Sequence, residues 1–103
     1  MADESLARLT VQELAGKIRA KQVSPVEVTA AVLARIERLN PEINAFTTVT
    51  GDLARDTAQV AEKEIMAGRY RGPFHGIPIG IKDLTNTAGI RTTYGSDSWK
   101  DYV

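Results

Sequence analysis

Residues 76–83 have the sequence Gly-Ile-Pro-Ile-Gly-Ile-Lys-Asp, an apolar run that lies between turn-forming residues and ends beside a lysine. Isoleucine favours extended backbone, and its recurrence at every second position predicts a β-strand over about 77–84. In such a strand the isoleucines would share one face, while Lys82 would lie on the other. The run therefore predicts that the fold contains a sheet and makes Lys82 the first candidate for chemistry.

An amphipathic helix is predicted near the start of the chain. Thr10 and Glu13 have the spacing of a capping box, in which each side chain binds the backbone N–H of the other residue. Apolar residues then recur at helical spacing, which predicts a helix over about 10–20.

A second helix is predicted over about 25–39. Ser24 and Glu27 form another capping-box pattern, and a proline occupies the first helical position, where its missing N–H costs nothing. Apolar residues recur at helical spacing up to Leu39, and Asn40-Pro41 is expected to end the helix.

Two more elements are predicted before the glycine-rich part of the chain. The branched and aromatic residues at 43–49 are flanked by turn formers, which is typical of a strand. A third helix is expected over about 52–67, with alanines along one face and Gly68 as its C-terminal cap. Together with residues 77–84, these patterns predict an α/β fold.

The composition is that of an ordinary globular domain of 103 residues, with 43% hydrophobic and 25% charged residues. Thirteen basic residues balance thirteen acidic ones, which gives no overall attraction to nucleic acid or to an acidic membrane. The dispersed Arg69, Arg71 and Arg91 are expected to lie on a solvated face.

Cysteine and histidine usage limits the possible chemistry. The absence of cysteine excludes disulfides and thiolate chemistry, and the single histidine, His75, excludes a zinc site of several histidines. No apolar run approaches the ~18 residues of a membrane span, so a cytoplasmic location is expected.

The residues around Lys82 allow a catalytic and a structural interpretation. A lysine that transfers protons must lose its charge, which requires desolvation or suitable neighbours. The alternative is a solvated lysine on an edge strand, a common protection against aggregation. Asp83 would point to the opposite face from Lys82, so we expect it to bind backbone or turn groups. His75 is expected to be a loop histidine rather than a catalyst.

Residues 72–84, together with Thr92-Thr93-Tyr94-Gly95-Ser96, resemble the amidase signature family, and residues 24–28 and 43–46 extend the resemblance more loosely. The resemblance implies an α/β/α fold with a large mixed sheet. This chain would hold only its N-terminal helices and first strands, as the N-terminal portion of a single domain spanning residues 1–103.

The resemblance also implies amide hydrolysis by a Ser-cisSer-Lys triad, in which Lys82 would be the lysine and no metal or cofactor is needed. In the family both triad serines lie in a glycine- and serine-rich segment downstream of the lysine. The only serines of this chain are Ser5, Ser24, Ser96 and Ser98. We therefore expect a chain that carries the triad lysine without either serine and is inactive alone.

Two other functions stay open at this point. The chain could belong to the A subunit of a tRNA-dependent amidotransferase, which would add partner subunits and an aminoacyl-tRNA. It could also be a noncatalytic binding module. For a generic amidase the expected partner is a small-molecule amide, without nucleic acid or membrane, and a homo-oligomer is compatible with the sequence.

Overall fold

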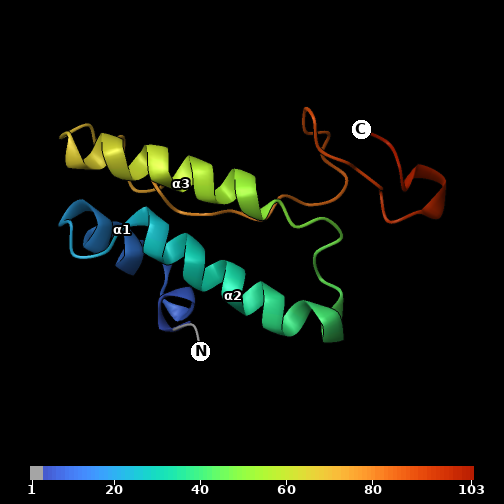
Figure 1. Ribbon diagram of the computed structural model, residues 1–103, viewed down its shortest axis with the longest axis horizontal. Helices are drawn as coiled ribbons and strands as arrows, with labels where there is room; N and C mark the ends of the chain where they lie inside the picture. The colour runs from blue at the N-terminus through green and yellow to red at the C-terminus, as the bar shows by residue number, and fades with distance from the viewer. Residues whose placement is uncertain (1–3) are drawn as a thin grey trace.

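The computed structural model describes residues 4–103, which form a bundle of α-helices followed by a long segment of loops (Figure 1). The elements in chain order are the 3-10 turn η1 (Ser5–Arg8), α1 (Val11–Arg19), α2 (Pro25–Ile43), α3 (Gly51–Met66) and the 3-10 turn η2 (Asp97–Trp99). The helices α2 and α3 lie side by side and run in opposite directions, and α1 lies near the start of α2 (Figure 1). None of the helices in this part of the chain is long and apolar enough to cross a membrane.

Both capping boxes are present. The Glu13 N–H donates to Thr10 Oγ1 at 3.1 Å, and the Thr10 N–H donates to Glu13 Oε2 at 2.9 Å. At the start of α2, the Ser24 N–H donates to Glu27 Oε1 at 3.2 Å, and Ser24 Oγ accepts from the Val26 N–H at 3.0 Å. These contacts join residues that are close in sequence, which is why the pattern alone predicts both helix starts.

The end of α2 differs from the expectation, because the helix passes through Asn40-Pro41 and ends at Ile43. A proline in the last turn sacrifices one backbone hydrogen bond, a smaller loss than in the middle of a helix. Asn44 then takes the left-handed conformation, with φ of 49°, and its N–H donates to the Asn40 carbonyl at 2.7 Å. The Asn40 side chain also binds the N–H of Phe46 at 2.8 Å and its carbonyl at 3.0 Å. The predicted strand at 43–49 is therefore wrong.

The helix α3 ends in the turn that Gly68 predicts. Gly68 has φ of 85°, and its N–H donates to the Ile65 carbonyl at 3.0 Å. The Arg69 N–H donates to the Glu64 carbonyl at 2.8 Å, which completes a Schellman motif. This turn directs the chain back along the α2–α3 pair, as the orange segment of Figure 1 shows.

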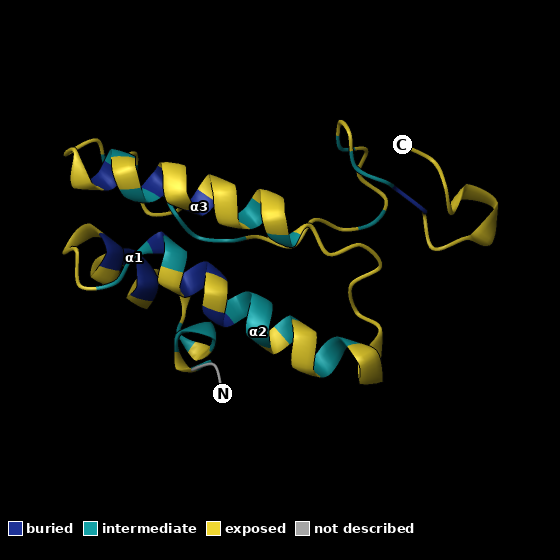
Figure 2. Cartoon of the chain, in the orientation of Figure 1, coloured by how far each residue is buried: buried dark blue, intermediate teal, exposed yellow. Residues whose placement is uncertain are grey.

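The hydrophobic core is small and lies where α1, the start of α2 and the end of α3 meet (Figure 2). Leu14, Ile18, Val28 and Ile65 form its buried centre. The partly buried side chains packed around it are Leu6, Leu9, Val23, Tyr70 and Ile77. Of the extended segment after Gly76, only Ile77 reaches this core.

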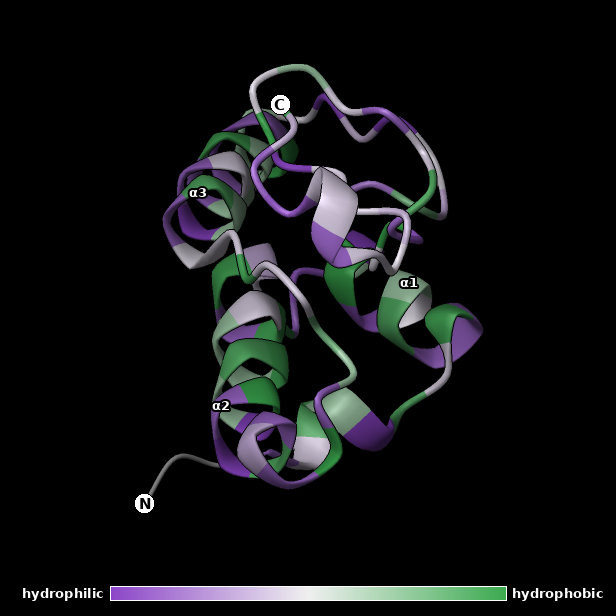
Figure 3. Ribbon diagram, turned by 90° about the vertical axis from the view of Figure 1, so that its right-hand side faces the viewer, coloured by the Kyte–Doolittle hydropathy of each residue, from purple (hydrophilic) through white to green (hydrophobic). Residues whose placement is uncertain are grey.

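The second half of the chain leaves many apolar side chains exposed. A compact domain of this length has a radius of gyration of about 13 Å, whereas the value here is 14.9 Å. Hydrophobic residues recur along the C-terminal loops as well as the helices in Figure 3. Exposed members of this half include Val60, Phe74, Ile79, Ile81, Leu84, Trp99 and Val103.

The expected α/β fold with a mixed sheet is wrong for residues 4–103, because they contain no strand and only one isolated bridge, between Thr87 and Ile90. The predicted strand at 77–84 is absent as such. A strand requires a neighbour that takes up its backbone hydrogen bonds, and no other described segment pairs with the backbone of residues 78–82. The residues described form helices and loops.

Candidate active site

The segment that leads to Lys82 is fixed at its beginning by Gly76. This glycine has φ of 85°, and a Cβ placed on it would lie 2.5 Å from Cγ of the buried Pro25. Neither the backbone conformation nor the space admits another residue without movement. With Ile77 in the core, the chain leaves the helices at one defined point.

A polar cluster ties the preceding turn to α3. His75 Nδ1 accepts from the Arg71 N–H at 3.0 Å, and His75 Nε2 lies 3.5 Å from Glu64 Oε1. The other oxygen of Glu64 binds the Arg71 guanidinium. The His75 side chain is only 8% exposed. The histidine thus holds the turn at 71–76 through its hydrogen bond with the Arg71 backbone, while its buried Nε2 makes no hydrogen bond among residues 4–103. The sequence alone gives no signal that His75 lies beside Glu64, because that residue belongs to a different element.

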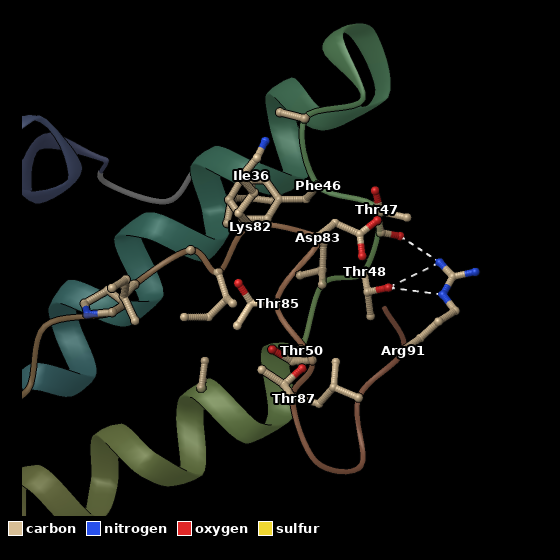
Figure 4. Close-up of a pocket in the computed structure, with 18 of the residues that line it drawn as sticks. Ile36, Phe46, Thr47, Thr48, Thr50, Lys82, Asp83, Thr85, Thr87 and Arg91 are labelled. Carbon is tan, nitrogen blue, oxygen red and sulfur yellow. Dashed lines mark hydrogen bonds between the residues drawn. The ribbon is translucent and has the colours of Figure 1, made fainter. Parts of the chain in front are cut away.

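A groove of about 400 Å³ opens beside the extended segment. It lies between the middle of α2, the loop at 45–50 and residues 78–92 (Figure 4). Ile36 and Phe46 form part of an apolar wall, and threonine hydroxyls, among them those of Thr85 and Thr87, add the uncharged polar groups. The groove can therefore hold an apolar group with a few hydrogen-bonding atoms.

Lys82 lies at this groove, close to Ile36 and Phe46 in Figure 4. Its backbone carbonyl accepts from the N–H groups of Leu84 at 2.8 Å and Thr85 at 3.0 Å, so the extended segment ends in a turn at the lysine. Its side chain is exposed and makes no hydrogen bond or ion pair with residues 4–103. The chain thus presents a lysine side chain with no partner among residues 4–103 beside a largely apolar groove.

Asp83 binds the loop that follows and not the lysine. Its carboxylate accepts from the Thr93 N–H at 2.8 Å and from the Thr93 hydroxyl, and its carbonyl accepts from the Tyr94 N–H at 3.0 Å. The predicted role of Asp83 in binding backbone and turn groups is confirmed by these contacts. The Thr93 hydroxyl, followed by the Thr93 N–H, lowers the pKa of Asp83; partial burial opposes this, and the Arg91 charge supports it.

This shift predicts a loop that opens in acid. Because the folded pKa of Asp83 lies below its unfolded value of about 3.9, the contact stabilises the loop above about pH 4, and its contribution is lost as the pH falls through the folded pKa. We expect the amide ¹H and ¹⁵N shifts of Thr93 to move toward random-coil values in that range. In Asp83→Asn this acid transition should vanish, whereas Asp101→Asn should leave it in place. A transition unchanged by Asp83→Asn would contradict the assignment.

Arg91 has a structural role that the sequence interpretation missed. Its guanidinium donates to Thr48 Oγ1 at 3.2 Å, to the Thr47 carbonyl at 3.1 Å and to the Lys100 carbonyl at 2.9 Å (Figure 4 shows the first two partners). The expectation of a solvated arginine gives no hint of this pairing, because Thr48 lies 43 residues away. Arg91 instead joins the loops that border the groove.

Two of the serines have structural roles. Ser24 caps α2, and its hydroxyl donates to Glu62. Ser96 Oγ accepts from the Ser98 N–H at 3.2 Å at the start of η2. These hydroxyls have local structural partners, which leaves Lys82 as the residue of this site with the strongest case for chemistry.

Comparison with protein-family models gives a match to the family described as Amidase over residues 27–103, which is most of the chain and includes the groove and Lys82. The chain belongs to the amidase family. The resemblance inferred from residues 72–84 and 92–96 is thereby confirmed.

Curated relatives carry two kinds of name within the amidase family. The A subunit of glutamyl-tRNA(Gln) amidotransferase from Geobacter sp. (strain M21) is 46% identical over 95 residues, which cover 92% of this chain and 19% of the relative. The corresponding protein of Mesorhizobium japonicum is 44% identical over 87 residues, 84% of this chain and 16% of the relative. An amidase of Pseudomonas putida is 41% identical over 92 residues, 89% of this chain and 20% of the relative.

The chain thus spans about a fifth of the length of these relatives. No solved structure matches it.

Proposed function

We propose that this chain is the N-terminal segment of an amidase that hydrolyses carbon–nitrogen bonds other than peptide bonds, and that Lys82 is the base of a Ser-cisSer-Lys relay. The observation that carries the proposal is the position of Lys82. Within the matched part of an amidase-family chain, a lysine with no partner of its own ends an extended segment at the edge of an apolar groove. Neither relay serine is assigned to this chain.

In the proposed relay the neutral amine of Lys82 takes a proton from the bridging serine. That serine takes the proton of the nucleophilic serine, whose oxygen bonds to the amide carbon. Backbone N–H groups of a glycine-rich loop would stabilise the oxyanion. The carbon–nitrogen bond then breaks, the leaving amine accepts the proton, and water hydrolyses the acyl-serine. Lys82 thus holds the proton between the two steps.

The relay requires a buried lysine, and in the isolated chain Lys82 is exposed. An exposed ammonium is hydrated and is a poor base, and burial is what favours the neutral amine. Lys82 is exposed here, so the remaining polypeptide would have to cover it. We therefore propose that the isolated chain is inactive.

The test compares the isolated chain with a chimera in which it replaces the matching residues of the Pseudomonas putida amidase. Ammonia release from an amide that the parent enzyme hydrolyses should be undetectable with the isolated chain and clear with the chimera. Hydrolysis by the pure isolated chain that disappears in Lys82→Ala would contradict the proposed inactivity. A folded chimera without any hydrolysis would contradict the proposed function.

A second candidate is the A subunit of a tRNA-dependent amidotransferase, which the 46% and 44% identities to two such proteins favour. It would act on a glutamine amide with partner subunits and an aminoacyl-tRNA. A chimera with the Geobacter protein separates this candidate from the generic amidase when glutamine hydrolysis is measured in the presence of the partner subunits. Activity there, and none in the Pseudomonas chimera, would reverse our preference.

The remaining parts of the proposal concern the cellular location, the cofactor requirement and the ligand. We propose a cytoplasmic protein that needs no metal or cofactor and binds a small-molecule amide. Cell fractionation of the natural protein tests the location, and dialysis of the chimera against a chelator tests the metal independence.

A further inference from the structure

Asp83 ties the backbone on the C-terminal side of Lys82 to a loop that lies ten residues further along the chain. Thr93 uses both oxygens of its carboxylate, one through the backbone N–H at 2.8 Å and the other through the hydroxyl. The Asp83 carbonyl also accepts from the Tyr94 N–H at 3.0 Å. Because Asp83 follows Lys82 directly, these contacts fix the peptide group that joins the two residues.

The anchor of this carboxylate lies inside the loop. Thr93 is only 5% exposed, and its hydroxyl oxygen also accepts from the Gly95 N–H at 3.2 Å. A hydroxyl has one proton to donate, and that of Thr93 is donated to Asp83. Hydrogen bonds to an ionised carboxylate are stronger than those between neutral groups. The anchor is therefore both buried and directional.

The turn at the lysine has few other supports. The hydrogen bonds from the Leu84 and Thr85 N–H groups to the Lys82 carbonyl are local to the turn, and the Thr92 hydroxyl adds a contact to the Thr85 carbonyl at 3.3 Å. The N–H and the amine of Lys82 make no hydrogen bond among residues 4–103. The side chains of Lys82 and Asp83 point in different directions (Figure 4), so the carboxylate acts on the lysine through the backbone between them.

We propose that Asp83 is a positioning residue for amide hydrolysis: anchored by Thr93, its carboxylate fixes the direction in which Lys82 presents its amine to the relay serines. The inference rests on the proposed function of Lys82. Misplacing a catalytic group by about 1 Å can cost about 10²-fold in rate. Loss of the contact between Asp83 and Thr93 should therefore lower kcat, and it should change KM little because the contact acts on the base and not on the bound amide.

The test measures kcat and KM for amide hydrolysis by the Pseudomonas chimera. Asp83→Ala removes both side-chain contacts and should lower kcat by about 10- to 100-fold, with a change in KM of less than ~3-fold. Asp101→Ala removes an exposed aspartate from the same C-terminal segment and should leave kcat within ~2-fold. A folded Asp83→Ala chimera that keeps its kcat, or whose loss lies in KM alone, would overturn the proposal.

Variants of Thr93 test the same contact from its other side and cover the case in which Asp83→Ala does not fold. Thr93→Val has nearly the same shape and keeps the backbone N–H but lacks the hydroxyl, and it should lower kcat by about 10-fold. Thr93→Ser keeps the hydroxyl and should lose less than ~3-fold. Equal losses in the two variants would show that the bond to Asp83 is not what matters and would overturn the proposal.

The Lys82→Ala background separates positioning from a purely structural role. If Asp83 acts through Lys82, adding Asp83→Ala should change the residual kcat of the Lys82→Ala chimera by less than ~2-fold. A residue that only stabilises the fold would lower kcat by the same factor in both backgrounds, and that result would overturn the proposal. Full activity in Lys82→Ala would overturn the proposed function and this inference with it, whereas a loss in Lys82→Ala without one in Asp83→Ala would overturn the inference alone.

Discussion

Replacing Lys82 by alanine in the Pseudomonas chimera is expected to lower kcat for amide hydrolysis by ~10³-fold or more, with little change in KM. General-base catalysis contributes about 10²- to 10⁴-fold, and a loss of ~10³ corresponds to about 4 kcal/mol of transition-state stabilisation. The loss should appear in kcat, because the amine would act on the relay serines and not on the bound amide. Initial rates at several amide concentrations, with circular dichroism as a check on folding, measure both constants.

Two matched variants decide whether the effect belongs to the amine at this position. Lys82→Arg keeps the positive charge but cannot give up a proton near neutral pH, so it should be as inactive as the alanine variant. Lys100→Ala removes an exposed lysine from the same C-terminal segment and should change kcat by less than ~2-fold, since surface substitutions away from a site have small effects. Full activity in Lys82→Arg would show that the charge matters and the base does not.

The second large effect is expected from Gly76→Ala, which should destabilise the chain by roughly 2–5 kcal/mol. A non-glycine residue in the left-handed region costs about 1–2 kcal/mol, and overpacking a close contact costs about 1–3 kcal/mol more. At Gly76 both occur, because φ is 85° and the new Cβ would lie 2.5 Å from Pro25 Cγ and 2.9 Å from Pro25 Cβ. Small domains have only about 5–15 kcal/mol of stability, so the loss should be evident in urea denaturation followed by circular dichroism.

Gly89→Ala separates the two contributions. Gly89 also has a positive φ, of 75°, but nothing lies within 4 Å of its Cβ position. It should lose only the conformational part, about 1–2 kcal/mol. On a Pro25→Ala background, which removes Cγ, the cost of Gly76→Ala should fall by about 1 kcal/mol or more. Equal losses at Gly76 and Gly89 would show that Pro25 does not restrict the segment.

The helices could be predicted because their limits depend on neighbouring residues. Both capping boxes and the glycine turn after α3 are contacts between residues at most five positions apart. The end of α2 could not be placed in the same way. The sequence predicts a stop at the proline, whereas the side-chain amide of Asn40 binds the backbone of Phe46 and organises the turn after the helix.

The expected strands failed for a different reason. Alternating isoleucines at 77–81 favour extended backbone, and the segment is extended, but a strand is defined by its partner. Residues 4–103 provide none, so the pattern could not produce a sheet within them. The alternation of isoleucines therefore could not show that residues 77–84 lack a pairing partner within 4–103.

The site shows the same division between local and distant contacts. The role of Asp83 could be anticipated, because its partner Thr93 lies in the loop that directly follows the segment. The contacts of Arg91 with residues 47 and 48, and of His75 with Glu64, join different elements and leave no mark in the sequence. The motif around Lys82 is what identifies the lysine.

Chemical rescue of the Lys82→Ala chimera by small primary amines tests the central claim most directly. If the lysine is the base of the relay, methylamine and ethylamine should enter the vacated space and restore part of kcat, and the restored rate should rise with the concentration of the neutral amine. Potassium chloride at the same ionic strength should restore nothing. A variant that loses ~10³-fold or more in kcat and responds to no amine, or one that keeps its activity without any, would contradict the assignment of Lys82 as the base.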